Sequence, residues 1–161
     1  MAGKVRNMAK IFVTKGENPL VNCNFLLRVE SLFDIPCKKV SGITQEQEFE
    51  TIQSGGVNNY VYLRQKPVSK PNTFQVERYI GTDFMDPLPV GMQTVLPLIL
   101  YVSRYPNDFT NPQGTFTFTG CTVMSKSFGD LDGEQAGLLV ETTTIAYQQV
   151  FFCSGGSEVI K

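Results

Sequence analysis

The stretch that decides the fold is a polar hairpin early in the chain. From Val40 to Lys66 it reads Val-Ser-Gly-Ile-Thr-Gln-Glu-Gln-Glu-Phe-Glu-Thr-Ile-Gln-Ser-Gly-Gly-Val-Asn-Asn-Tyr-Val-Tyr-Leu-Arg-Gln-Lys. Side chains from Thr44 to Gln53 alternate between two faces, as they do in a strand. Gly55 and Gly56 follow, and glycine supplies the positive φ angles that a hairpin turn needs. The stretch therefore predicts two long strands joined by a tight turn.

Both faces of this predicted hairpin are too polar to lie only on the core of a small monomer. One face of its first strand carries Glu46, Glu48 and Glu50. Buried carboxylates without partners are very costly, so these side chains must face water or a partner. A long strand pair that is polar on both faces favours pairing with strands of other chains. A second hairpin, around Gly129 to Gly137, has the same character.

The composition is that of an ordinary globular domain. The chain has 161 residues, of which 42% are hydrophobic and 18% charged, and a net charge of -1. This size allows a real core, and the charge gives no overall attraction to nucleic acid or to an anionic membrane. We expect one domain over residues 1–161, with an N-terminal segment over 1–24 and a flexible tail over 154–161. No signal peptide or transmembrane run is recognisable, so we expect synthesis in the cytoplasm.

Strand signals recur about every dozen residues with turn signals between them, which is typical of a sandwich or barrel. Besides the hairpin, strands are expected over Phe25 to Phe33, Thr73 to Ile80, Val95 to Ser103, Thr115 to Ser127 and Leu138 to Phe152. Gly120 predicts a bend or bulge. Two prolines and a glycine interrupt Thr82 to Thr94, so one short helix there is the most that we expect. The predicted fold class is mainly β, a single barrel-like or sandwich-like domain with long hairpin arms.

The residue types on which most enzymes depend are scarce. The chain contains no histidine, which removes the commonest general base and metal ligand and every Ser-His or Cys-His nucleophile. Glu46, Glu48 and Glu50 resemble a carboxylate pair, because alternate strand residues lie about 6.6 Å apart, a separation that glycosidases use. Since the chain has no tryptophan to stack on a sugar, a hydrated acidic surface is the better interpretation. We expect no catalytic site and no enzyme.

Two further patterns point weakly to metal. The loop Asp130-Leu131-Asp132-Gly133-Glu134 lacks the alternating acidic positions and the closing glutamate of an EF-hand loop, which favours a solvated acidic turn. The cysteines contain no Cys-x-x-Cys pair, so free thiols are expected. They are Cys23, Cys37, Cys121 and Cys153. We expect no metal and no cofactor.

Several motifs follow one another in a recognisable order. They are Val40-Ser41-Gly42-Ile43, the glutamates at 46, 48 and 50, the turn Gly55-Gly56-Val57-Asn58, the strand from Thr73 to Gly81, Phe118 to Val123, and Leu139 to Tyr147. This order resembles the tail-tube proteins of contractile phages and the related inner-tube proteins of contractile injection systems, and it extends from Phe25 to Val150. That family places a helix where this chain has Thr82 to Thr94.

The resemblance implies a protomer that assembles into a hexameric ring, with rings stacked into a hollow tube inside a contractile sheath. Its arms would form a shared inner β-barrel in the ring. The implied assembly or lumen residues are Glu46, Glu48, Glu50, Gly55, Gly56, Asn58 and Glu141. An acidic lumen would let DNA slide, since phosphate contacts create affinity.

The same resemblance implies the partners. These are further copies of the chain, a sheath, a baseplate hub and tape-measure proteins, with DNA or protein cargo in transit and no membrane binding. The particle would be a phage tail, a bacteriocin-like particle or an injection machine, with the subunit made in the bacterial cytoplasm. The alternatives from the residues alone are a soluble β-barrel module that binds a ligand in its core and, less favoured, a carboxylate-based hydrolase.

Overall fold

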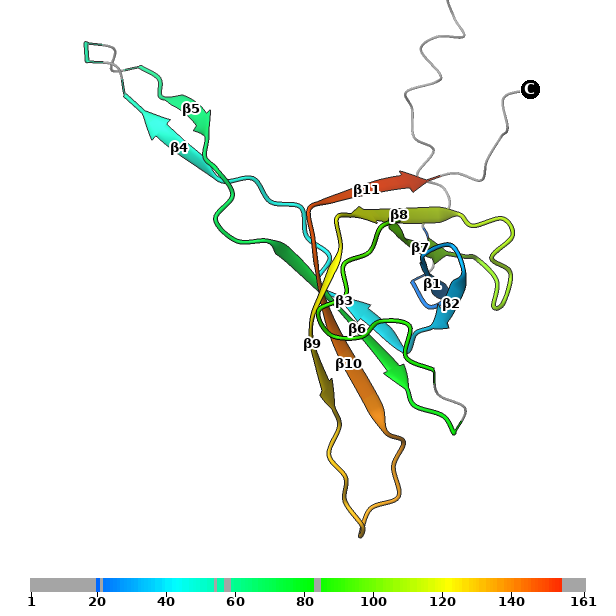
Figure 1. Ribbon diagram of the computed structural model, residues 1–161. Coiled ribbons are helices and arrows are strands. Elements are labelled where there is room, and N and C mark those ends of the chain that lie inside the picture. The colour runs from blue at the N-terminus through cyan, green and yellow to red at the C-terminus, as the bar shows by residue number, and fades with distance from the viewer. Residues whose placement is uncertain (1–19, 21, 54, 57–58, 83–84, 155–161) are drawn as a thin grey trace, which may run out of the picture.

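The structure is a computed structural model that describes residues 20, 22–53, 55–56, 59–82 and 85–154, and all regular structure in these ranges is β (Figure 1). The strands are β1 (Phe25–Val29), β2 (Phe33–Pro36), β3 (Lys39–Ser41), β4 (Phe49–Ile52), β5 (Tyr62–Gln65), β6 (Asn72–Tyr79), β7 (Leu98–Val102), β8 (Gly114–Thr119), β9 (Thr122–Phe128), β10 (Val140–Tyr147) and β11 (Gln149–Ser154). The mainly β fold predicted from the sequence is confirmed.

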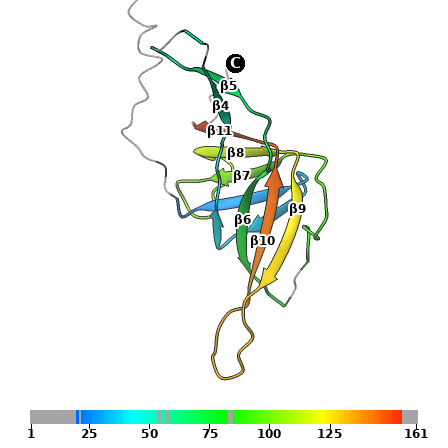
Figure 2. The same cartoon turned by 90° about the vertical axis from the view of Figure 1, so that its left-hand side faces the viewer.

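The strands form two facing sheets and a separate ribbon. The five-stranded sheet has the order β11-β8-β7-β1-β2, the four-stranded sheet has the order β3-β6-β10-β9, and β4 pairs with β5 alone. All strand pairs are antiparallel. In Figure 2 strands β7, β8 and β11 run across the direction of β6, β9 and β10, which is the orthogonal way of packing two sheets. The sheets do not close into a barrel, so the protomer is sandwich-like.

The core lies between the two sheets. Leu27, Leu98 and Phe118 of the five-stranded sheet meet Phe74 and Ile145 of the four-stranded sheet, and all five side chains are fully buried. The Phe74 and Phe118 rings stack at 4.3 Å between centroids. Such aromatic contacts add to the burial of apolar area that stabilises the sandwich.

Two strands expected to be continuous are each divided between the sheets. Thr115 to Ser127 forms β8 and β9, and Leu138 to Phe152 forms β10 and β11. The expected bend at Gly120 is present, with φ at +59°. A Cβ at Gly120 would lie 2.4 Å from Cδ of Gln148, the residue at the other corner. Glycine is therefore needed here for its backbone angle, whereas the flexible Gln148 side chain can move away from a Cβ.

The expected strand from Phe25 to Phe33 is instead a hairpin, so that prediction was wrong. Glu30 and Ser31 form its turn with φ angles of 51° and 57°. The sequence carries no glycine or asparagine at these positions, which is why the turn was missed. Pro36 ends β2, an edge strand, where the missing N–H group interrupts no inner ladder.

The described part of Thr82 to Thr94 contains no helix. Residues 85–94 run irregularly beside the start of β9, with hydrogen bonds from Gly91 N to Val123 O and from Val123 N to Met92 O, both 2.9 Å. Gly91 has a φ of +87°, and the prolines remove N–H donors that a helix would need. None of the described residues belongs to a helix long and apolar enough to span a bilayer.

Candidate assembly surface

The arm, residues 44–66, leaves the sandwich and projects away from it (Figure 1). Its ladder is shorter than expected, because β4 covers Phe49–Ile52 rather than Thr44 to Gln53. Residues 44–48 form no ladder, although Lys66 N still donates to Glu48 O at 2.9 Å and keeps the two chain segments together.

Apolar side chains occupy both faces of the arm and are exposed on both. Directly opposite residues of a ladder share a face, so Phe49 and Leu63 lie on one face while Ile52 and Tyr62 lie on the other. Their exposed fractions are 52% for Phe49, 69% for Leu63, 43% for Ile52 and 51% for Tyr62. An isolated two-stranded ribbon is marginal in water, and exposed apolar patches mark interaction sites. The arm is therefore incomplete within one copy of the chain.

The arm's acidic residues are not aligned on one strand face as the sequence predicted. Glu46 and Glu48 are exposed but precede β4, and only Glu50 lies in the ladder. Glu50 stands opposite Arg64, with Oε1 3.6 Å from Nε. This exposed pair is worth little to stability in water. Glu46 and Glu48 thus remain exposed at the base of the arm, where Lys66 and Lys70 also lie.

The turn at the arm's tip agrees with the sequence expectation where it is described. Gly56 has a φ of +98°, a conformation that glycine adopts without strain. Gly55 lies in the same turn and is exposed. Asn58 lies outside the described residues.

The arm meets the sandwich at Tyr147, the last residue of β10. The Tyr147 ring is buried against Phe74 and Phe118, with centroids 5.7 and 5.1 Å away. Its hydroxyl accepts a hydrogen bond from Thr44 N at 3.0 Å and donates one to Thr44 O. A core side chain thus satisfies both backbone polar groups of the first arm residue.

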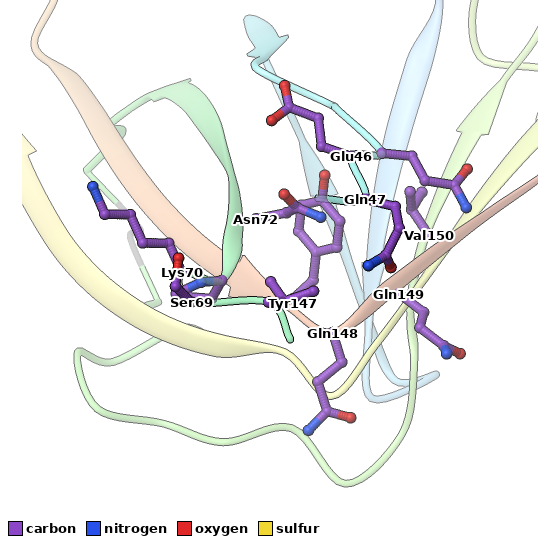
Figure 3. Close-up of a pocket in the computed structure, with 12 residues that line it drawn as sticks. Glu46, Gln47, Ser69, Lys70, Asn72, Tyr147, Gln148, Gln149 and Val150 are labelled. Carbon is purple, nitrogen blue, oxygen red and sulfur yellow. The ribbon is translucent and has the colours of Figure 1, made fainter. Parts of the chain in front are cut away.

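A hollow of about 590 Å³ lies beside this junction (Figure 3). It is lined by residues 45–47 of the arm, 68–72 of the returning chain and 147–150 at the corner between β10 and β11. In Figure 3 the Tyr147 ring points toward the segment that carries Glu46 and Gln47. The base of the arm therefore has open space on this side rather than a packed layer.

A group of charged side chains is buried on the inner face of the four-stranded sheet. Glu141 is fully buried and lies opposite Arg78 in the ladder between β6 and β10. Arg78 Nε and Nη2 donate to Glu141 Oε1 at 3.1 and 2.9 Å, and Thr143 Oγ1 donates to the same oxygen at 2.9 Å. Lys126 Nζ lies 3.3 Å from it. The structure thus places Glu141 inside the protomer, apart from the glutamates of the arm.

Asp86 connects the segment 85–94 to this buried group. Its carboxylate bonds to Lys126, accepts from Leu88 N at 3.1 Å and lies 3.3 Å from Arg78 Nη2. Partial burial raises the pKa of Asp86, but these hydrogen bonds and the two cations outweigh it and hold the pKa below its ordinary value. Two cations and two anions balance in charge, which makes the burial of Glu141 and Arg78 tolerable, while Asp86 lies at the exposed end of the group.

The acidic loop at 130–134 is an exposed turn in which Glu134 N donates to Asp132 Oδ1 at 2.9 Å. In the described part of the chain, no three cysteine or acidic side chains gather as a metal site would require.

Sequence reasoning missed Arg78, Lys126 and Tyr147. A usable signal was present for the first, because Arg78 follows Phe74 and Val76 at the spacing of one strand face. Arg78 stands on the apolar face of one predicted strand and Glu141 on the apolar face of another. Opposite charges at such positions indicate a buried ion pair. The bond from Tyr147 to Thr44 has no comparable sequence signal, since it joins residues 103 positions apart.

Comparison with known proteins gives a likeness of fold. No protein-family model and no curated protein sequence matches the chain. A chain in the sheath/tube terminator of the PVC extracellular contractile injection system superposes with a TM-score of 0.70 at 14% identity, over 86% of this chain and 99% of that one. A chain in the PVC sheath-tube complex gives 0.67 at 13% identity, over 91% and 97%. A chain in the anti-feeding prophage baseplate gives 0.64 at 19% identity, over 85% and 97%. The protein therefore has the fold of the tube-like proteins of contractile injection systems, as the order of its sequence motifs implied.

Proposed function

We propose that this protein is a structural subunit of the inner tube of a contractile tail or injection machine. Copies form a hexameric ring, and rings stack into a hollow conduit for DNA or protein cargo. The observation that carries the proposal is the arm, which exposes apolar side chains on both faces and whose outer strand edges pair with no other strand of the described residues. The fold shared with chains of a sheath-tube complex supports the same role.

Neighbouring copies supply what the arm lacks. One face of the arm, with Phe49 and Leu63, packs on the next copy, and open strand edges pair between copies to build the shared inner barrel. Such a contact joins different surfaces of two identical chains, so rotation must close it into a ring. Gly55, Gly56 and Asn58 shape the tip that each copy presents to its neighbours.

The lumen of the tube is acidic at the arm bases. Glu46, Glu48 and Glu50 face it and repel the phosphates of DNA, so cargo slides without binding. Replacement of all three by lysine is expected to make assembled tubes retain DNA at low salt, with retention lost as salt rises. DNA retention by unmodified tubes, or none by the lysine variant, would contradict this placement.

The other partners are a contractile sheath, a baseplate hub and a tape-measure protein. The particle is a virion tail or an injection particle whose subunits are made in the bacterial cytoplasm. A structural role of this kind requires no catalytic residues. Glu141, which contacts both Arg78 and Lys126, is buried inside the protomer. A ligand site of the β-barrel type would need space between the sheets. Core side chains fill most of it, and an apolar hollow of about 270 Å³ remains between β3 of one sheet and β1, β7, β8 and β11 of the other.

Two leucines offer a matched test of the arm. Leu63 lies on the arm and is 69% exposed, while Leu32 lies in the turn between β1 and β2 and is 80% exposed. Leu63→Ser is expected to abolish rings and tubes in electron micrographs, whereas Leu32→Ser assembles like the unmodified chain. Both variants should unfold within about 0.5 kcal/mol of the unmodified protein, because exposed substitutions change stability little. Equal assembly of the two variants would refute a role for the arm.

A further inference from the structure

The junction between arm and sandwich depends on very few contacts. Among the described residues, the two hydrogen bonds between Tyr147 and Thr44 are the only ones that join segment 44–66 to a strand of either large sheet. Ser69 Oγ, in the chain that returns to β6, donates to Glu48 Oε1 at 3.4 Å, and the remaining bonds at the base stay within the arm. Gln47 Nε2 donates to Glu48 O and Lys66 O at 3.2 and 3.1 Å. The two bonds of Gln47 hold the outgoing and returning segments of the arm to each other. They do not fix the direction of the arm relative to the sandwich.

The chain on either side of the junction offers little other restraint. Residues 42–48 form no ladder, and the first of them, Gly42, has a φ of +80°. The hollow of about 590 Å³ separates the arm base from the corner at residues 147–150, so no packed layer supports the arm there. A ribbon attached in this way would turn about its base unless one group held it.

Tyr147 is suited to hold it. Its ring is fixed in the core against Phe74 and Phe118, which makes the position of the hydroxyl rigid. A hydroxyl has one donor and two acceptor sites, and Tyr147 uses both functions on Thr44 N–H and C=O. Two bonds to one peptide residue fix its orientation as well as its position.

We infer that the Tyr147 hydroxyl is a positioning group that sets the direction of the arm relative to the sandwich, and that neighbouring copies dock on the arm only in that direction. This inference rests on the proposed tube function for its second half. Its first half concerns a single copy and is measurable without assembly. Pre-setting the arm lowers the entropy that each copy loses when it joins the ring.

The test removes one oxygen atom with Tyr147→Phe and compares it with Tyr105→Phe, a tyrosine in an exposed loop. In Tyr147→Phe the Thr44 amide is expected to exchange with solvent about tenfold faster, the effect of one lost hydrogen bond. Residual dipolar couplings of the arm amides should shrink relative to those of β6 and β10, since the arm no longer shares one orientation with the sandwich. The unfolding midpoint should change little, because Thr44 is exposed and water replaces the hydroxyl. Tyr105→Phe should change none of these quantities.

Assembly is then measured by electron microscopy at equal protein concentration. Tyr147→Phe is expected to lose most of its rings and tubes while Tyr105→Phe keeps them. Unchanged arm couplings in Tyr147→Phe would overturn the positioning role, and a mobile arm with normal assembly would overturn the claim that direction matters. If Tyr147→Phe does not fold, exchange in the unmodified chain decides, because an unprotected Thr44 amide overturns the inference and a protected one supports it. If the unmodified chain never assembles, the tube function fails while the couplings still test the positioning role.

Discussion

The arm and the β9–β10 hairpin both extend beyond the sandwich, yet only the second is built on it. Strand β10 pairs with β6 on one side and β9 on the other, and its inner face is buried. Strands β4 and β5 pair with each other alone and are exposed on both faces. Similar semi-polar sequences thus occupy two environments. The difference teaches that the two large sheets stabilise the β9–β10 hairpin, whereas the described residues give the arm no neighbouring strand.

The largest expected difference is in the free energy of unfolding, between variants of two arginines that each pair with a glutamate. Arg78→Met removes two hydrogen bonds and one of the two cations beside the buried Glu141, and it is expected to destabilise the protein by about 3–5 kcal/mol, because Lys126 alone then faces the carboxylates of Glu141 and Asp86. Arg64→Met removes the exposed partner of Glu50 on the arm and should cost about 0–1 kcal/mol. Urea unfolding of both variants measures the contrast. Equal losses would mean that the two hairpins are stabilised alike.

Phenylalanines give a second contrast of similar size. Phe74 on β6 is fully buried and stacked on Phe118, so Phe74→Ala is expected to lose about 3–5 kcal/mol. Phe49→Ala on the arm should lose less than about 0.5 kcal/mol in the single copy and yet reduce assembly. Thermal unfolding and electron microscopy of the same samples check both halves. A Phe49→Ala variant that is strongly destabilised as a monomer would sink the comparison.

Much of the framework was predictable from the sequence because alternation is local. Thr73 to Ile80 shows its alternation in the sequence, and the structure forms β6 over Asn72–Tyr79. The bend at Gly120 was expected, but neither the change of sheet there nor the corner at Gln148 was, because both depend on two sheets packing across each other. The local sequence on either side of these corners does not predict how the two sheets pack. The semi-polar pattern likewise predicted two unsatisfied hairpins, and tertiary pairing with β6 satisfied one of them.

The position and turn of the candidate surface were predictable from the sequence, but the side-chain contacts that connect it to the sandwich were not. The acidic residues and the glycine turn of the arm were visible as a pattern. The group of Arg78, Lys126 and Asp86 around Glu141, and the bond from Tyr147 to Thr44, join segments from distant parts of the chain. Such long-range contacts follow from the packed structure. A single sequence indicates only that charged residues stand at strand positions that otherwise face the core.

Acid should weaken the sandwich at Asp86. The pKa of Asp86 is held below its ordinary value in the folded protein, so its contribution to stability is present above the ordinary carboxylate pKa of about 4 and is lost as the pH falls below it. Asp86→Asn is expected to flatten the decline of the unfolding free energy below about pH 4. An unchanged pH profile in Asp86→Asn would remove Asp86 from this role.

The smallest effect concerns the cysteines, which are all free thiols as expected. Burial raises the pKa of Cys37 to about 12 and that of Cys121 to about 11, while Cys23 and Cys153 are exposed. Iodoacetamide at pH 8 should therefore modify Cys23 and Cys153 first, because the thiolate is the nucleophile. Raised thiol pKa values also mean that stability falls as the pH rises above about 9, where the unfolded thiols ionise first. Equal labelling rates at all four sites in the folded protein would contradict the burial.

The direct passage of β10 into β11 also has a mechanical consequence. The two strands are consecutive in the chain and belong to different sheets, so a pull along β10 reaches the five-stranded sheet through covalent bonds. The 8 residues of β10 are flanked by antiparallel ladders on both sides, and a load along the strand shears many hydrogen bonds together instead of opening them one by one. A protein with its strands connected in this way resists stretching best along the direction of its longest strands.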